Sequence, residues 1–117
     1  MSKHETRISL RQMIENAEKA EALVQDMTYD QFIADWRTQL VAERLIEIIG
    51  EAANRLPDEL REQYPVIPWR QMIGTRNWLA HGYDAVDYQI IWDVLTKHLV
   101  FVRTQALQIM TDLETRG

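Results

Sequence analysis

The sequence predicts an all-α fold, an antiparallel up-and-down bundle of four main helices with one short extra helix. Three observations support this fold class. The three prolines all fall between Pro57 and Pro68, which leaves long proline-free stretches on both sides. The pairs Asn-Gly, Asp-Gly and Gly-Gly, which are the strongest hairpin signals, do not occur in the sequence. Apolar residues recur at steps of three and four, the spacing of an α-helix that buries one face.

Two main helices are predicted before the prolines. The first covers about residues 5–26, because its apolar residues form one stripe. These are Leu10, Met13, Ile14, Ala17 and Val24. Thr28 opens the sequence Thr-Tyr-Asp-Gln, in which Gln31 has the spacing of a capping box, so the second helix should begin there. That helix should continue without a break to Arg55, because Leu56 precedes a proline and is disfavoured in the helical conformation.

The rest of the chain is predicted to form the short helix and two further main helices. The short helix is expected over residues 58–63. Pro68 suits the first position of the third main helix. This helix should end near His81, because the glycine that follows suits a left-handed cap. Asp87 can cap the last helix, residues 88–114. The apolar side of that helix comprises Ile91, Val94, Leu95, Val102, Ile109 and Leu113.

Composition excludes several classes of protein. A length of 117 residues predicts a single domain, residues 1–117. The absence of cysteine excludes disulfide scaffolds, thiol catalysis and cysteine-ligated zinc, and we expect neither a metal site nor a cofactor. The longest apolar run is Leu99-Val100-Phe101-Val102, so no membrane-spanning segment is expected. The first residues lack the apolar stretch of a secretion signal, which predicts a cytoplasmic location.

The charge balance limits how the protein can bind nucleic acid. The chain has 13 lysines and arginines against 18 aspartates and glutamates, a net charge of −5. Phosphate contacts dominate nucleic-acid affinity, and they need basic surface. Any binding of nucleic acid must therefore depend on a local cluster of basic residues.

Arg76 interrupts the apolar face of the third main helix. At 100° per residue, the apolar residues of this helix lie within about 80° of Trp69, and Arg76 falls in the middle of their arc. They are Met72, Ile73, Leu79 and Ala80. A guanidinium directed at a core or an interface must be paired or must bind an anion, because a lone buried charge is costly. Arg76 is therefore either half of a structural ion pair with a carboxylate of the second helix or part of an anion site.

The second helix carries a break of its own. One arc along it is apolar in the first half and acidic in the second. The arc comprises Phe32, Ile33, Trp36 and Leu40, followed by Glu43, Glu47 and Glu51. The glutamates either form a solvated face, as most such stripes do, or include the partner of Arg76.

His81 lies five residues after Arg76, about 140° round a regular helix, so the two side chains do not face each other along an unbroken helix. Two arrangements would bring them together. The end of the helix can turn His81 inward, or a symmetric dimer can bring Arg76 of one subunit to His81 of the other. Histidine exchanges a proton near neutral pH, although a histidine at a helix C-terminus is often only a dipole partner. Tyr83 follows in the next turn, where it either packs or lies beside this chemistry.

Residues 76–83 have the sequence Arg-Asn-Trp-Leu-Ala-His-Gly-Tyr. This motif resembles the signature of the HEPN ribonucleases and, more closely, the R-x4-H-x-Y form of the HepT toxins. The spacing of Arg and His alone is a weak pattern, but its context is similar too. The similar segments are Ile49-Gly50-Glu51-Ala52, Ile67-Pro68-Trp69, Tyr83-Asp84 and the region of Trp92. The resemblance therefore covers most of the chain and implies a HEPN-like helical bundle.

The resemblance implies a metal-independent endoribonuclease, in which the ribose 2′-hydroxyl of RNA attacks the adjacent phosphodiester. It implies that His81 is the general acid or base and that Arg76 holds the scissile phosphate and stabilises the charge of the transition state. Asn77 would orient the phosphate or the histidine, and Glu51 would position Arg76. The site in this family is composite across a homodimer, which would relieve the 140° separation and create a local cationic cleft.

The resemblance also implies a toxin–antitoxin pair. The implied partner is an MntA-like nucleotidyltransferase antitoxin, which binds the toxin in a complex and inactivates it by transferring AMP to the tyrosine of the motif, Tyr83. An added phosphate beside Arg76 and His81 would occupy the anion site and repel RNA by its charge.

Two alternatives stay open at this point. The first is a catalytically silent HEPN module that binds nucleotide or RNA and partners a nucleotidyltransferase. The second is a dimeric helical bundle in which the pair formed by Arg76 and a glutamate is purely structural. In that case removal of Arg76 should cost several kcal/mol of stability, as breaking a buried ion pair does.

Overall fold

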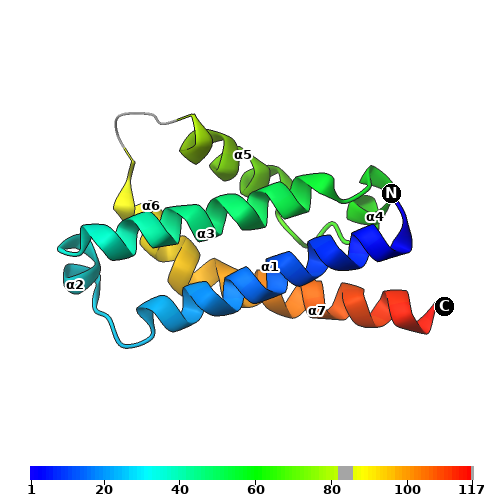
Figure 1. Ribbon diagram of the computed structural model, residues 1–117, viewed down its shortest axis with the longest axis horizontal. Helices are drawn as coiled ribbons and strands as arrows, with labels where there is room; N and C mark the ends of the chain where they lie inside the picture. Colours follow the sequence, from blue (N-terminus) through cyan, green and yellow to red (C-terminus); the bar gives the residue numbers. More distant parts are fainter. Residues whose placement is uncertain (82–85, 117) are drawn as a thin grey trace.

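The protein is described by a computed structural model that covers residues 1–81 and 86–116, and these residues form helices without any strand (Figure 1). The predicted all-α fold is confirmed. The four longest helices are α1 (Lys3–Val24), α3 (Trp36–Arg55), α5 (Trp69–Ala80) and α7 (Leu99–Thr115). The shorter elements are α2 (Tyr29–Ile33), α4 (Asp58–Gln63), α6 (Tyr88–Asp93) and the π-helical stretch η1 (Val94–His98).

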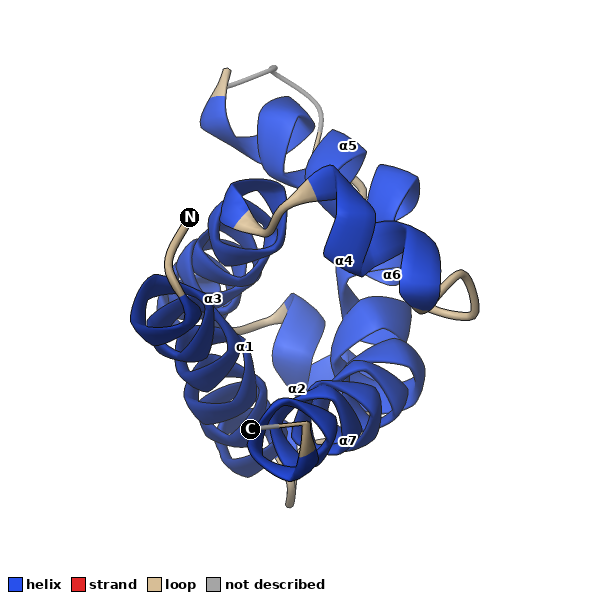
Figure 2. Cartoon of the chain, turned by 90° about the vertical axis from the view of Figure 1, so that its right-hand side faces the viewer, coloured by secondary structure: helices blue, strands red, loops and turns tan. Residues whose placement is uncertain are grey.

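The helices pack around α1 and α3, which run alongside each other in opposite directions (Figure 1). Helix α1 also packs against α7, and α3 also packs against α5. Figure 2, an end-on view, shows α5 as an outer helix on the far side of α3 from α1. The core lies between α1, α3 and α7. Its fully buried side chains include Leu10, Met13, Phe32, Ile49, Leu95 and Ile109. None of the described helices is both long enough and apolar enough to cross a membrane.

The prediction of one continuous second helix up to Arg55 is wrong, because this segment forms two helices, α2 and α3. The carboxylate of Asp35 caps α3 by accepting hydrogen bonds from the backbone N–H of Thr38 at 3.2 Å and from its hydroxyl at 2.8 Å. The side chain of Gln39 donates to the carbonyl oxygens of Phe32 and Ile33 at 3.0 and 2.9 Å. These bonds replace the helical bonds that the last turn of α2 lacks, so the chain can change direction here without burying unpaired carbonyls.

The starts of the other helices follow the predictions closely. Thr28 and Gln31 form the predicted capping box, with their reciprocal bonds at 3.1 and 2.9 Å. The first helix begins two residues earlier than predicted, because Ser2 accepts a hydrogen bond from the N–H of Glu5 at 3.1 Å. Pro68 is the cap of α5 rather than its first residue, since its ψ of 66° lies outside the helical range. The short helix over residues 58–63 is confirmed as α4.

The last predicted helix is capped by Asp87 as expected, with the carboxylate accepting from the N–H of Gln89 at 3.0 Å. It is not a regular α-helix throughout, because η1 interrupts it. The buried residues Ile91, Leu95 and Leu99 recur at steps of four, which drift by about 40° per step in an α-helix. The wider turn of a π-helix keeps all three on the core side. The predicted cap Gly82, between α5 and this segment, lies outside the described residues.

Candidate functional site

Helices α3 and α5 cross at Gly50. A Cβ atom added to Gly50 would collide with the Cβ of Arg76 and would lie 2.9 Å from the carbonyl oxygen of Met72. Only a residue without a side chain allows the two backbones to come this close. The crossing therefore holds Arg76 against α3, with about a third of its side chain exposed.

The guanidinium of Arg76 has two partners in this position. Its Nη1 donates a hydrogen bond to the amide oxygen of Asn77 at 3.0 Å, and its Nη2 lies 3.6 Å from an Oε1 oxygen of Glu51. Its Nε is buried and has no hydrogen-bond partner in the part of the chain that the structure describes. The ion pair with Glu51 is longer than a strong charge-assisted hydrogen bond, which is typically about 2.8 Å.

Two further arginines surround Glu51, and sequence reasoning missed both. Arg44 lies 3.3 Å from Glu47 and 3.8 Å from Glu51, and Arg55 lies 3.9 Å from Glu51. We call these four residues and Arg76 the arginine cluster. It contains three arginines and two glutamates, so it carries a local excess of positive charge in an acidic chain. The four residues of α3 are spaced so that they share one helical stripe, and this spacing was a usable signal.

Glu43 stands apart from the arginine cluster although it lies on the same predicted arc. It accepts a hydrogen bond from the hydroxyl of Tyr88 at 3.2 Å. Burial raises the pKa of the Glu43 carboxyl and the pKa of the Tyr88 hydroxyl. Of the three glutamates on this arc, Glu51 is the one whose carboxylate lies within ion-pair distance of Arg76.

His81 lies at the C-terminal end of α5 and is exposed. Its backbone N–H donates to the carbonyl oxygen of Asn77 at 3.2 Å, which closes the last turn of the helix. Because α5 is regular between the two residues, the side chains of Arg76 and His81 leave it in directions about 140° apart. The structure thus brings Arg76, Asn77 and Glu51 together but leaves His81 outside this group. Tyr83 lies outside the described residues.

The arrangement is suited to binding an anion. Guanidinium groups bind phosphate through their forked N–H donors, and three of them approach one carboxylate here. An incoming phosphate would compete with Glu51 for the same donors. Within residues 1–81 and 86–116, no group of three or more histidines and carboxylates is placed so that it could share a metal ion.

Comparison with known proteins decides the family. The family model described as "Ribonuclease HepT-like" matches residues 13–109, which is most of the chain. The chain belongs to the ribonuclease HepT-like family. A relative from Methanocaldococcus jannaschii named "Putative RNase" is 34% identical over 114 residues, 97% of this chain and 94% of that protein. A "Probable ribonuclease HepT" from Thermococcus cleftensis is 32% identical over 90 residues, 77% of this chain and 82% of that protein. No solved structure matches the chain significantly.

Family membership supports ribonuclease activity in general, and it confirms the resemblance drawn from residues 76–83 and their context. It also agrees with the all-α, HEPN-like bundle of the structure. The roles of individual residues in that activity are proposals, which follow.

Proposed function

We propose that this member of the HepT-like family is a metal-independent endoribonuclease toxin that acts in the cytoplasm. In the proposed reaction, the ribose 2′-hydroxyl attacks the adjacent phosphorus, a P–O2′ bond forms and the P–O5′ bond breaks. The products are a 2′,3′-cyclic phosphate and a free 5′-hydroxyl. His81 moves the proton of the attacking or leaving oxygen, and Arg76 holds the phosphate and its developing charge.

The observation that carries this proposal is the arginine cluster at the crossing of α3 and α5. Arg76 is held at its Cβ by the close contact with Gly50, while its guanidinium makes only a 3.6 Å contact with Glu51. Asn77 holds one Nη of the same group. The Cβ of Arg76 is fixed in place, but its guanidinium group is only weakly paired. This guanidinium can therefore exchange the carboxylate of Glu51 for a phosphate oxygen. The surplus positive charge supplies the local attraction for RNA that the whole chain lacks.

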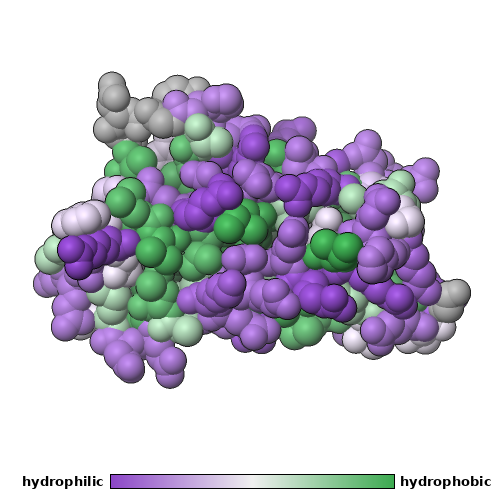
Figure 3. Space-filling view, viewed as in Figure 1, coloured by the Kyte–Doolittle hydropathy of each residue, from purple (hydrophilic) through white to green (hydrophobic). Residues whose placement is uncertain are grey.

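A homodimer is part of the proposal, because Arg76 and His81 of one chain point in different directions. An exposed apolar stripe offers the surface for it. The stripe consists of Trp36 and Leu40 of α3, which are 62% and 56% exposed, together with Ile33 at the end of α2, which is 42% exposed. Along α3 it leads directly into the arginine cluster, since Arg44 and Glu47 continue the helical spacing of Trp36 and Leu40. Figure 3 shows hydrophobic side chains gathered on the face formed by α3 and α1, toward the end that carries α2. A second copy packed on this stripe would lie next to the cluster.

Regulation by an MntA-like nucleotidyltransferase antitoxin completes the proposal. AMP transferred to Tyr83 would place a phosphodiester anion two residues from His81. The arginine cluster would bind that anion, so the modification would block the site for RNA. Mass spectrometry of the intact protein, expressed with and without the partner gene, should show added AMP that Tyr83→Phe abolishes and that Tyr29→Phe leaves in place.

Cleavage of RNA in EDTA by protein made without the antitoxin tests the reaction. Arg76→Ala and His81→Ala should each lower the cleavage rate by about 100-fold or more, since each removes one catalytic group. His4→Ala, a change at an exposed histidine of α1, should leave the rate unchanged. Because the pair of Arg76 and Glu51 is partly exposed and long, Arg76→Ala should cost only about 1 kcal/mol of stability or less.

Three other outcomes would each contradict part of the proposal. Cleavage that requires an added metal ion would remove the metal-independent mechanism. Binding of RNA that depends on Arg76 without any strand scission would favour the silent binding module. Loss of several kcal/mol of stability in Arg76→Ala, with unchanged specific activity of the folded fraction, would favour a purely structural ion pair.

A further inference from the structure

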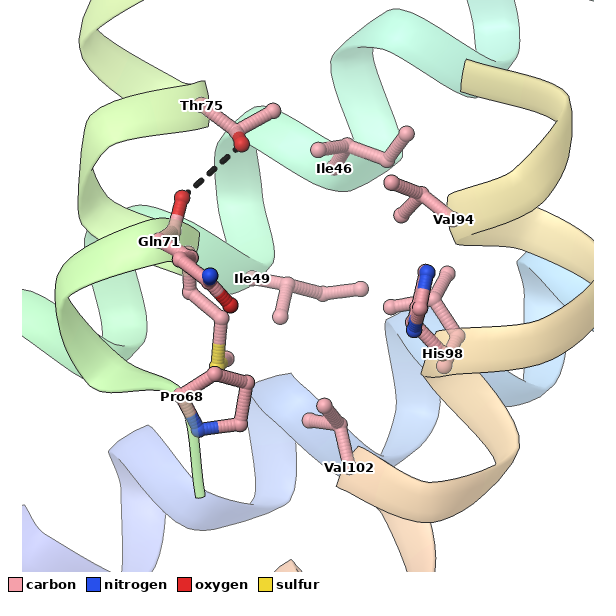
Figure 4. A pocket seen from close by; sticks show the side chains of 11 residues that line it. Ile46, Ile49, Pro68, Gln71, Thr75, Val94, His98 and Val102 are labelled. Carbon is pink, nitrogen blue, oxygen red and sulfur yellow. Dashed lines mark hydrogen bonds between the residues drawn. The ribbon is translucent and has the colours of Figure 1, made fainter. Parts of the chain in front are cut away.

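A cavity of about 310 Å³ lies along one flank of α5, between α5 and η1 (Figure 4). One wall is α5, the opposite wall is η1 with the start of α7, and α3 lies behind them. The lining is mainly aliphatic. It includes Ile46, Ile49, Met72, Val94, Leu99 and Val102. Because α5 packs chiefly against α3, this flank of α5 is left open.

Two polar side chains face each other across this cavity. Figure 4 shows the amide of Gln71 and the imidazole of His98 directed into it from opposite walls. Both residues are also open to solvent, so these polar groups stand at the mouth of the cavity rather than deep inside it. Thr75 also lines the cavity, but its hydroxyl already donates to the backbone carbonyl of Gln71 at 2.8 Å (Figure 4). The cavity thus offers hydrogen-bonding groups on two sides of an apolar space.

The π-helical stretch contributes one side of this arrangement. His98 is the last residue of η1, and Val94, which also lines the cavity, is the first. Single π-helical turns are rare and are frequently found at functional sites. Here the turn keeps Leu95 and Leu99 in the core while it presents Val94 and His98 to the cavity.

The cavity adjoins the helix crossing at Gly50, which is one of its lining residues, but the charged groups of the arginine cluster lie outside it. Arg76, Glu47 and Glu51 do not line it, and no lysine, arginine, aspartate or glutamate is among its lining residues. Helix α5 presents Gln71 and Thr75 to the cavity and Arg76 to the cluster. A ligand of the cavity therefore meets apolar groups and the polar side chains of Gln71, Thr75 and His98, and this lining favours an uncharged ligand.

We propose that this cavity binds a small, neutral, planar heteroaromatic compound of about the size of a purine. Its faces would pack against the aliphatic walls, and its polar edge would bond Gln71 on one side and His98 on the other. A glutamine amide offers one donor and one acceptor side by side, which matches the donor–acceptor edge of adenine. The volume and the apolar lining with few convergent polar groups are those of a small-molecule site. This site does not rest on the proposed ribonuclease reaction.

Titration of the full chain with adenine, followed by NMR chemical shifts, tests the proposal. A ligand of this size should bind with a dissociation constant on the order of 1 mM, with shifts confined to the cavity lining. Gln71→Ala and His98→Ala should each weaken binding about 3- to 10-fold, the effect of one lost hydrogen bond. Thr75→Phe, which fills the cavity, should abolish the shifts. His4→Ala should bind adenine as the wild type does.

Several results would overturn the proposal. No saturable shift up to the solubility limit of adenine would mean that the cavity is closed in solution or covered by a second copy. Shifts that are centred on the arginine cluster would place the ligand elsewhere. Equal affinity of the wild type, Gln71→Ala and His98→Ala for adenine would show that Gln71 and His98 do not bond the ligand. Circular dichroism must show that the Thr75→Phe protein is folded. If it is unfolded, Val94→Phe takes its place as the variant that fills the cavity. The proposal requires that this variant also lose the chemical-shift changes.

Discussion

Gly50 is the residue on which the geometry of the candidate site depends most. Because an added Cβ would collide with Arg76 and approach the carbonyl oxygen of Met72, Gly50→Ala must push α5 away from α3. We expect it to lower the free energy of unfolding by about 1 to 3 kcal/mol, the usual cost of overpacking a helix contact. Urea denaturation followed by circular dichroism measures this change.

Gly74, on α5 itself, provides the matched control. No atom lies within 4 Å of the Cβ that would be added there, and Gly74 is exposed. Gly74→Ala should therefore raise stability by about 0.5 to 1 kcal/mol through helix propensity alone. Equal effects of the two substitutions would show that the helices do not cross at Gly50 as described.

At the same scale, the sequence predicted part of the arginine cluster and not the rest. The place of Arg76 on an otherwise apolar face could be read from helical spacing, and so could the presence of a glutamate within its reach. Helical spacing does not distinguish Glu43, Glu47 and Glu51, because it contains nothing about how two helices cross. The choice of Glu51 came with the family resemblance, and Glu51 is the glutamate that lies 3.6 Å from Arg76. Arg44 and Arg55 were not predicted, because the prediction rested on the apolar and acidic residues of this arc and not on the basic residues beside them.

The break between α2 and α3 is the main feature that element-level prediction missed. The apolar period runs through it, and no proline or glycine marks it. What breaks the helix is side-chain competition for backbone groups, by Asp35 at the start of α3 and by Gln39 at the end of α2. The π-helical stretch was missed for a related reason, since a run of steps of four is compatible with a helix of either width over a short segment.

The Asp35 cap makes the free energy of unfolding depend on pH. The hydrogen bonds from the backbone and the hydroxyl of Thr38 lower the pKa of Asp35 below its ordinary value of 3.8. A carboxyl whose pKa is lower in the folded state stabilises that state above the unfolded pKa, and the stabilisation is lost as the pH falls through the folded pKa. The wild type should thus exceed Asp35→Asn in stability at neutral pH, and the difference should shrink below about pH 4. Thermal unfolding of both proteins from about pH 7 to pH 3 measures this, and a constant difference would rule out an ionised cap.

For the whole molecule, the exposed apolar stripe leads to a specific prediction about dimer formation. Trp36 is the most exposed large hydrophobic residue of the described chain, and large aromatic residues often dominate the energy of an interface. If the stripe is the dimer surface, Trp36→Asp should convert a dimer to a monomer in light scattering after size-exclusion chromatography. Val66→Asp, at a similarly exposed position away from the stripe, should leave the dimer intact. A wild type of monomeric mass would contradict the proposed dimer directly.

The composite site makes the sharpest demand on the whole molecule, because it requires Arg76 and His81 from different subunits. Inactive Arg76→Ala and inactive His81→Ala proteins, mixed in equal amounts and allowed to exchange subunits, should form about one-half mixed dimers. Each mixed dimer holds one site with both groups and one site with neither, so the mixture should recover about a quarter of the wild-type cleavage rate. A site built within one chain would stay inactive in every combination, because each chain lacks one group. Recovery should also disappear when Trp36→Asp is added to both variants, since monomers cannot combine their residues.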